Sequence, residues 1–200
     1  TKRFKLGFTL FEIGRSAYSQ IDLKTSARPI MEDLMEKTQT SVFLGILNWD
    51  HVTVLYIVES RQDFKITAPV GTTIPLLAGA VGKAFLAAMD EEQALKILKS
   101  KGLPRFTDNS ITDAEAYYEA LKKVSENGDA VDDEEYILGV RAVASALRGL
   151  GQLKSAVWVV GFKASLDEKK MKMITREIPR AAEAISRRIQ EQLLNKRKAS

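Results

Sequence analysis

The sequence predicts an α+β domain in which antiparallel strands form a sheet with helices on both faces. Two pairs of period-two runs predict the strands, residues 40–48 with 51–60 and residues 139–148 with 152–162. In the first pair both strand faces are apolar, which indicates a sheet that helices cover on each side. Apolar stripes at steps of three and four residues around these runs predict the covering helices.

The first strand pair should form a hairpin that turns at Trp49–Asp50. A third strand is expected over Asp63–Pro69, where Phe64, Ile66 and Ala68 would share one face. The second strand pair turns at residues 149–151. These runs together predict most of one sheet.

Helix signals separate the strands. Pro29 falls inside the second expected helix and should kink it or mark a tight turn. Asp90 should cap one helix, and the spacing from Thr112 to Glu115 matches a capping box for the next. The final helix carries the stripe Ile174, Ile178, Ala181, Ile185, Ile189 and Leu193. Helices are therefore expected over residues 6–21, 22–37, 81–89, 91–101, 112–127 and from about Asp167 onward.

Composition excludes several classes of function. The chain has 200 residues of which 45% are hydrophobic, enough for one large domain or one domain with appendages. Without cysteine it can form no disulfide, thiolate zinc site or cysteine nucleophile, and His51 alone is a weak basis for a metal centre or for catalysis. No signal peptide or apolar run of membrane-spanning length is apparent. We therefore expect a cytoplasmic, non-enzymatic protein with no cofactor, no metal and no membrane partner.

In the stretch from Ile74 to Met89, the small residues Ala78, Gly79 and Ala80 precede a run that favours a helix from Val81 onward. The first turn of a helix has four N–H groups without intrahelical partners and a partial positive charge, so a carboxylate could bind there directly. Close packing against a strand explains the same small residues, and the sequence leaves both interpretations open. A nucleotide-binding loop is excluded, because Ala84 follows Lys83 where that motif needs Ser or Thr.

An acidic run, Asp132–Glu135, precedes the fourth long strand. It could supply acid–base groups or a magnesium site, but adjacent carboxylates point in different directions. We expect Asp133, Glu134 and Glu135 to lie in a solvated loop, and Asp132, at the end of a strand, to point inward. A hydrolase with Asp132 as its base is a remote alternative.

Four segments in a fixed order resemble the isocitrate lyase regulator (IclR) family of bacterial transcription factors. They are KRFKLGFTLFEIG, VGTTIPLLAGAVGKAFLA, ITDAEAYYEALKKVSENGDAVDDEEYILGVRAVASAL and the closing strand ending in Val-Gly. The resemblance covers nearly the whole chain. It implies a GAF-like (profilin-like) curved antiparallel sheet flanked by helices, preceded in the family by a winged helix-turn-helix domain that this sequence lacks.

The resemblance also implies a division of the chain. Residues 1–21 would be a connector helix from the missing DNA-binding domain, residues 22–195 the effector-binding domain, and residues 196–200 a basic tail. DNA would be contacted only through the missing domain, which leaves the basic residues near both termini as solvated groups rather than base readers. Self-association as a homodimer or tetramer is expected.

Family effector sites resemble a cup on the sheet whose ligand carboxylate meets backbone amides at the helix opening. Where the members that bind small oxoacids have a cysteine and two serines, this chain has Ala142, Trp158 and Val160, so we expect a small carboxylate effector with an apolar or aromatic body. The alternative is a GAF-like signalling or dimerisation module whose cup is vestigial because Trp158 fills it. Phe64 is added by strand alternation from Ile66. The expected effector-binding residues are Phe64, Ile66, Gly79, Ala80, Val81, Asp132, Ala142, Trp158 and Val160.

Overall fold

A six-stranded antiparallel sheet forms the centre of the domain, in the order β3-β2-β1-β6-β5-β4. The computed structural model describes residues 23–198, so the expected connector helix over residues 1–21 lies outside the described part. The strands are β1 (Ser41–Asn48), β2 (His51–Val58), β3 (Thr73–Pro75), β4 (Ala130–Asp133), β5 (Val140–Leu147) and β6 (Ser155–Phe162). This arrangement confirms the predicted α+β class and the curved antiparallel sheet.

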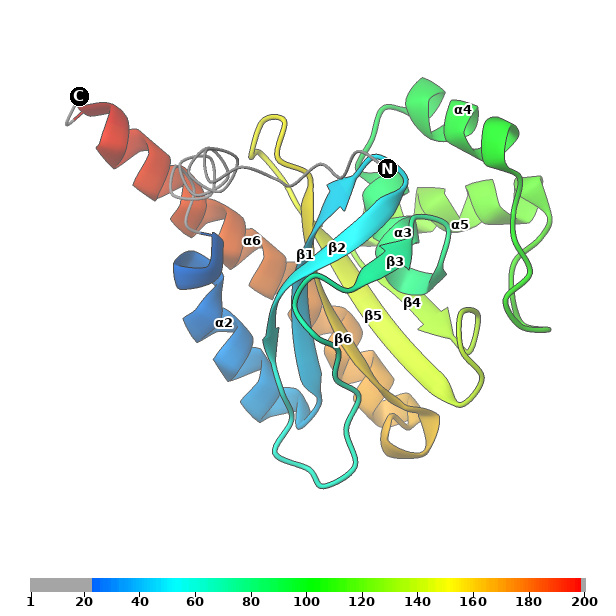
Figure 1. The fold of residues 1–200 in the computed structure, drawn as a ribbon, viewed down its shortest axis with the longest axis horizontal. Helices are drawn as coiled ribbons and strands as arrows, with labels where there is room; N and C mark the ends of the chain where they lie inside the picture. The colour runs from blue at the N-terminus through cyan, green and yellow to red at the C-terminus, as the bar shows by residue number, and fades with distance from the viewer. Residues whose placement is uncertain (1–22, 199–200) are drawn as a thin grey trace, which may run out of the picture.

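Helices cover both faces of the sheet, as the apolar strand faces predict (Figure 1). On one face α2 (Leu23–Thr38) packs beside α6 (Glu168–Lys198), which a short 3-10 turn, η1 (Lys163–Ser165), connects to β6. On the other face α3 (Gly79–Ala87) packs against β4, β5 and β6 and contacts α4 (Glu91–Lys101) and α5 (Ala114–Asn127). The predicted α6 stripe is buried from Ile174 to Ile189, and Leu193 is half-buried. No helix in residues 23–198 is long and apolar enough to cross a membrane.

The sheet separates two hydrophobic cores. The α2–α6 core contains Met31, Leu44, Val159 and the buried isoleucines of α6. The α3-side core contains Phe43, Phe85, Tyr117 and Trp158. Because successive strand residues point to opposite faces, Trp158 and Val159 belong to different cores. The α3-side core contains most of the expected effector residues.

The expected strand over Asp63–Pro69 is wrong. Residues 59–72 form a loop, and the chain rejoins β2 only where the Gly71 N–H donates to the Val54 carbonyl at 2.8 Å. β3 follows at Thr73–Pro75, paired with residues 51–53. Alternating polarity alone does not make a strand, because a strand also needs a partner edge within hydrogen-bonding distance.

Two local expectations also need correction. α2 runs through Pro29 from Leu23 to Thr38, so the tight-turn interpretation of that proline is wrong. The residue that caps α5 is Asp113, not Thr112, since the Asp113 carboxylate accepts from the Ala116 N–H at 2.8 Å. Asp90 holds the N-cap position of α4 but makes no side-chain cap hydrogen bond.

Gly82 fixes how closely α3 packs against the preceding turn. A Cβ atom at this position would lie 1.9 Å from the Leu76 carbonyl oxygen, and backbone atoms cannot move aside cheaply. We expect Gly82→Ala to lower the free energy of unfolding by about 2 kcal/mol or more, measured by urea denaturation. Gly151→Ala is the matched control, because its Cβ would meet open space and only its positive φ of 64° adds strain, costing about 1 kcal/mol. Equal losses in the two variants would contradict this account of α3.

Candidate functional site

The opening of α3 lies against a carboxylate. Gly79 has a left-handed φ of 57°, and a Cβ atom there would lie 2.1 Å from Oδ2 of Asp132. Glycine is needed for both reasons, the backbone conformation and the close approach. Ala78, before the helix, makes no side-chain cap, and the first-turn N–H groups of a helix have no intrahelical partner, so within residues 23–198 these donors of α3 lack a capping side chain. Gly79 and Asp132, two of the expected effector-binding residues, therefore lie against each other.

Asp132 points inward, as expected, and its residue surface is only 4% exposed. Its Oδ1 accepts a 2.6 Å hydrogen bond from the Glu135 N–H. Burial raises the pKa of Asp132 to about 6, and the Glu135 carboxylate contributes to the rise while Lys83 and backbone N–H groups oppose it. This carboxyl group therefore titrates close to neutral pH.

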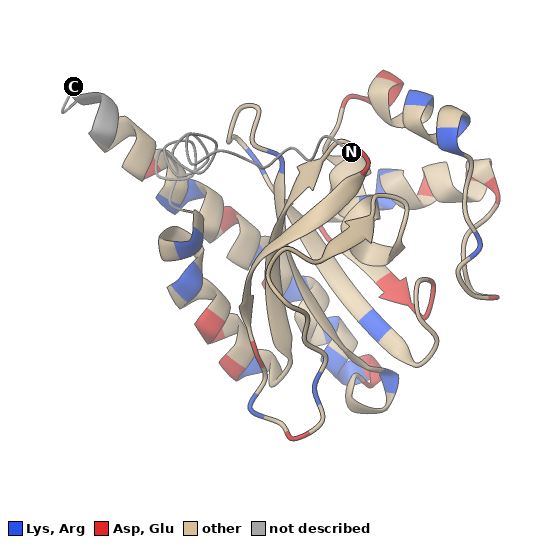
Figure 2. Cartoon of the chain, in the orientation of Figure 1, with Lys and Arg blue, Asp and Glu red and all other residues tan. Residues whose placement is uncertain are grey.

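The rest of the acidic run is only partly solvated, which corrects the sequence-based expectation: Asp133 is exposed but ends β4, whereas Glu134 and Glu135 lie in the loop after it and are half-buried. Glu135 pairs with Lys83 at 2.5 Å, where the lysine side chain is 4% exposed and the glutamate side chain 17%. Arg141 pairs with the half-exposed Asp133, and Lys163 pairs with Glu134. Figure 2 shows these acidic positions at the end of β4 and a basic position on the adjacent β5. Asp133, Glu134 and Glu135 thus each pair with a cation, and Lys163 also lies 3.9 Å from Asp133.

The loop between α4 and α5 holds the acidic run in place. The Thr107 hydroxyl donates to the Glu134 carbonyl at 2.6 Å, and the Ser110 hydroxyl donates to the Glu135 carbonyl at 2.7 Å. Next to this turn, Tyr136 packs edge-on against Phe106 with ring centroids 5.0 Å apart. This loop thus holds the turn that carries Asp132 and Glu135 through hydrogen bonds and an aromatic contact.

Gly79 and Asp132 form what we call the charged corner. Beside it, a group of apolar side chains that we call the apolar wall continues across the sheet. Ala80, Val81, Ala142 and Trp158 are buried together, and the half-buried Ile66 and Val160 pack against the same cluster. Trp158 is 3% exposed and stacks on Phe43 with ring centroids 5.5 Å apart and planes at 16°. Its ring lies so close to Gly45 that a Cβ there would meet a ring carbon at 2.8 Å. Trp158 is therefore a buried and closely packed member of the apolar wall.

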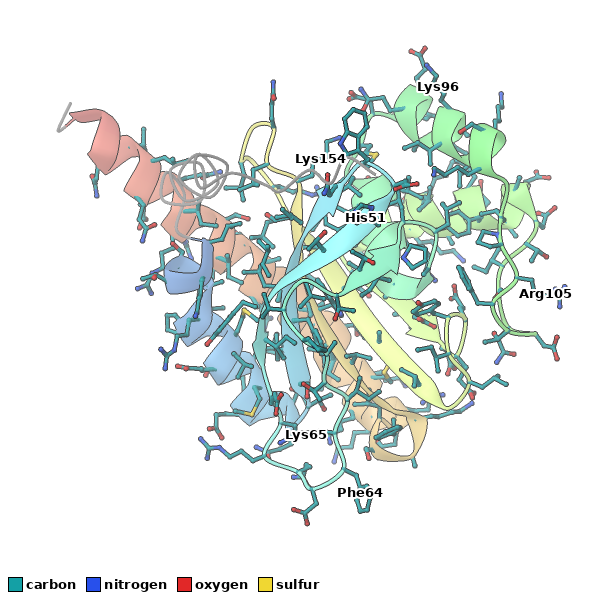
Figure 3. All side chains as sticks on the ribbon, viewed as in Figure 1. His51, Phe64, Lys65, Lys96, Arg105 and Lys154 are labelled. Atoms are coloured by element: carbon teal, nitrogen blue, oxygen red, sulfur yellow. The ribbon has the colours of Figure 1, made fainter. Side chains whose placement is uncertain are left out.

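A cavity of about 480 Å³ opens where loop 59–72 passes the end of β6. Ile66 and Val160 line it, together with polar groups of Ser41, Ser60 and Lys170. Phe64 also lines it, but its surface is 87% exposed and its ring points away from the sheet (Figure 3). Phe64 was expected in the effector site because it would lie on the same strand as Ile66. That strand does not exist, and Phe64 instead lines the cavity from loop 59–72.

The expected residues therefore fall into three adjoining groups. Gly79 and Asp132 form the charged corner, Ala80, Val81, Ala142 and Trp158 form the buried wall, and Phe64, Ile66 and Val160 line the cavity.

Sequence reasoning missed two polar side chains that interact with Glu135. Lys83 had been considered only as a nucleotide-loop lysine, although a lysine within the apolar run VGKAFLAAM is itself a sign of a buried cation that needs a partner. Tyr117, on α5, has a buried hydroxyl with no hydrogen-bond partner among the described residues. Burial, with a contribution from the Glu135 carboxylate, raises the pKa of Tyr117. No pattern in the sequence marks this tyrosine, which occupies an ordinary buried position of an amphipathic helix.

Comparison with known proteins defines the class. The family model described as "Bacterial transcriptional regulator IclR C-terminal" matches residues 15–187. The HTH-type transcriptional regulator BhcR of Paracoccus denitrificans is 31% identical over 187 residues, which cover 93% of this chain and 67% of that protein. KdgR of Escherichia coli is 31% identical over 144 residues, covering 72% of this chain and 55% of that regulator. These matches define a C-terminal domain of bacterial transcriptional regulators.

Solved structures agree with this class. The crystal structure of Thermotoga maritima IclR has a TM-score of 0.79 at 26% identity, over 92% of this chain and 74% of that chain. The C-terminal domain of Escherichia coli KdgR has a TM-score of 0.72 at 26% identity, over 84% of this chain and 99% of that domain. The chain belongs to the IclR family, as its sequence motifs indicate. Its named relatives are regulators and repressors rather than enzymes, which supports the expectation of a non-enzyme.

Asp132 should make the stability of the domain depend on pH. Its pKa of about 6 in the folded domain lies above the ordinary 3.8, so the folded state favours the protonated form. The contribution of this group to the free energy of unfolding is fully present below about pH 4 and is lost as pH rises through 6. A difference of two pKa units corresponds to about 3 kcal/mol of this free energy. Asp132→Asn keeps the oxygen that accepts from Glu135 but cannot ionise. We expect this variant to gain stability relative to the parent protein between pH 4.5 and 7.5, measured by urea denaturation. A difference that stays constant with pH would contradict the assignment.

Proposed function

We propose that this chain is the effector-sensing and self-association domain of an IclR-type transcriptional regulator, and that its effector is a small carboxylate with an apolar or aromatic body. The observation that carries the proposal is the continuity of the charged corner with the apolar wall. A carboxylate at the opening of α3 would have Asp132 and Lys83 beside it, and its body would lie toward Ile66, Ala142 and Val160.

The side chains of the wall support the apolar part of this proposal. Ala142 and Val160 carry no hydrogen-bonding group, and the ring of Trp158 stacks on Phe43. A two- or three-carbon oxoacid would leave its polar atoms unpaired against such a wall, which costs free energy. A longer or aromatic acid would instead bury apolar area, which contributes about 25 cal/mol per Å².

Regulation would operate by linkage. An effector that binds one arrangement of the protomers better than another shifts the population by its differential affinity. The chain spans 55% to 67% of the length of the curated relatives BhcR and KdgR, which are named HTH-type regulators. DNA contact is therefore assigned to a helix-turn-helix domain outside this sequence. Homodimers or tetramers in the cytoplasm are the proposed working form.

A second function has one observation in its favour. Trp158 is only 3% exposed and fills space against Phe43, which is expected of a cup that no longer takes a ligand. In that case the domain would act chiefly in dimerisation. The two functions differ in one measurable property, which is whether any carboxylic acid stabilises the folded domain.

A thermal-shift screen tests the proposed function. The acids run from glyoxylate and pyruvate through octanoate to phenylacetate. A ligand at one hundred times its Kd adds about 2.7 kcal/mol, which at this size raises Tm by about 5–10 °C. We expect octanoate or phenylacetate to give such a shift and glyoxylate to give none.

Ile66→Asp locates the site in the same screen. Ile66 is half-buried against the wall, so a carboxylate there should abolish the shift. Val70→Asp is the matched control, since Val70 lies on the same loop with 65% of its surface exposed. Tight binding of glyoxylate alone would contradict the proposed effector class, and no response to any acid would favour the dimerisation function. Truncation of Trp158 is unsuitable as a test, because removing a buried tryptophan costs about 3–5 kcal/mol of stability.

A further inference from the structure

Lys83 carries a buried positive charge in a helix that is otherwise apolar. Its side chain is 4% exposed and its ammonium group lies 2.5 Å from a Glu135 carboxylate oxygen. A buried ammonium requires an anionic partner, and Glu135 is the only carboxylate paired with it among residues 23–198. This pair is separate from the nine residues expected from the sequence.

The geometry of a helix directs this ammonium toward the opening of α3. Lys83 follows Gly79 and Ala80 by one turn, and long helical side chains lean toward the N-terminus of their helix. The Asp132 carboxylate, which lies against Gly79, is close enough to Lys83 for the lysine to lower its pKa. The cation and the free N–H groups of the first turn therefore face the same corner.

Glu135 has a second hydrogen-bond donor nearby. The Tyr117 hydroxyl is buried and has no partner among the described residues. Burial raises the pKa of Tyr117, and the Glu135 carboxylate adds to the rise. An unpaired buried hydroxyl is rare in folded proteins and calls for an explanation. It would have a partner if Glu135 turned away from Lys83.

We propose that Glu135 occupies, in the absence of ligand, the place that the effector carboxylate takes on Lys83. When the effector binds, its carboxylate pairs with Lys83, and Glu135 turns to accept a hydrogen bond from Tyr117. In this exchange one carboxylate replaces another on the Lys83 ammonium, and no proton passes between Lys83, Glu135 and Tyr117. The exchange rests on the proposed function, and it connects the effector site to α5 through Tyr117.

Two substitutions test the exchange, with octanoate and phenylacetate as the probes and isothermal titration as the measurement. Glu135→Gln removes the competing charge, so the affinity for the acid should rise about tenfold. Tyr117→Phe removes the second donor, so the affinity should fall about tenfold while the ligand-free domain melts at or above the parent temperature. Tyr118→Phe is the matched control, because the neighbouring Tyr118 hydroxyl bonds to Glu91 on α4 instead. It should leave the affinity unchanged.

A spectroscopic measurement separates the exchange from a purely structural role of Tyr117. In protein with ¹³C-labelled tyrosine Cζ, the signal that Tyr117→Phe removes should shift downfield as the acid is added, as a phenol that donates to a carboxylate requires. The signal that Tyr118→Phe removes should stay in place.

The outcomes distinguish the two proposals. Failure of the parent protein and of Glu135→Gln to bind either acid would overturn the effector proposal and the exchange together. Binding that is equally tight in the parent, Glu135→Gln and Tyr117→Phe, with a stationary Tyr117 signal, would overturn the exchange alone.

Discussion

The close approach of the first turn of α3 to the acidic turn after β4 is the constraint on which the site depends. Two contacts enforce it: Gly79 lies against the Asp132 carboxylate, and Lys83 pairs with Glu135. Gly82 in addition lets α3 pack against the Leu76 carbonyl of the turn before it. Each places a charge or a backbone group where almost any other residue would introduce a clash or an unpaired ion. Loosening any of them would separate the N–H donors of α3 from the apolar wall. The proposed effector site is therefore tied to the packing that holds α3 on the sheet.

The sheet explains why this corner can be specialised without loss of the fold. The core between α2, α6 and the sheet is built from aliphatic side chains such as Met31, Leu44 and Ile178. The opposite face carries the stacked rings of Phe43 and Trp158 together with the buried charges. Stability can come largely from the first face, which leaves the second free to hold groups that cost stability, such as a buried lysine and an unpaired phenol.

The sequence predicted the parts of this structure that depend on regular periodicity. The two hairpins, the stripe of α6 and the inward position of Asp132 follow from patterns repeated over many residues or from the end of a strand. The strand expected over Asp63–Pro69 is part of a loop, because alternation at Phe64, Ile66 and Ala68 says nothing about a partner edge. Glu135 was assigned to solvent because its partner, Lys83, lies 52 positions away. Contacts of that separation are set by topology, and neither residue alone reveals them.

We propose that a carboxylate effector binds beside Asp132, Lys83 and Glu135. Titration calorimetry of phenylacetate or octanoate near pH 6.5, in buffers of different ionisation enthalpy, tests it most directly. A second anion in this corner should raise the pKa of Asp132 further above 6, so binding should take up a proton and the affinity should fall as pH rises. We expect the apparent binding enthalpy to depend on the buffer in the parent protein. In Asp132→Asn the apparent binding enthalpy should be the same in every buffer. Binding without proton uptake, or uptake that persists unchanged in Asp132→Asn, would contradict it.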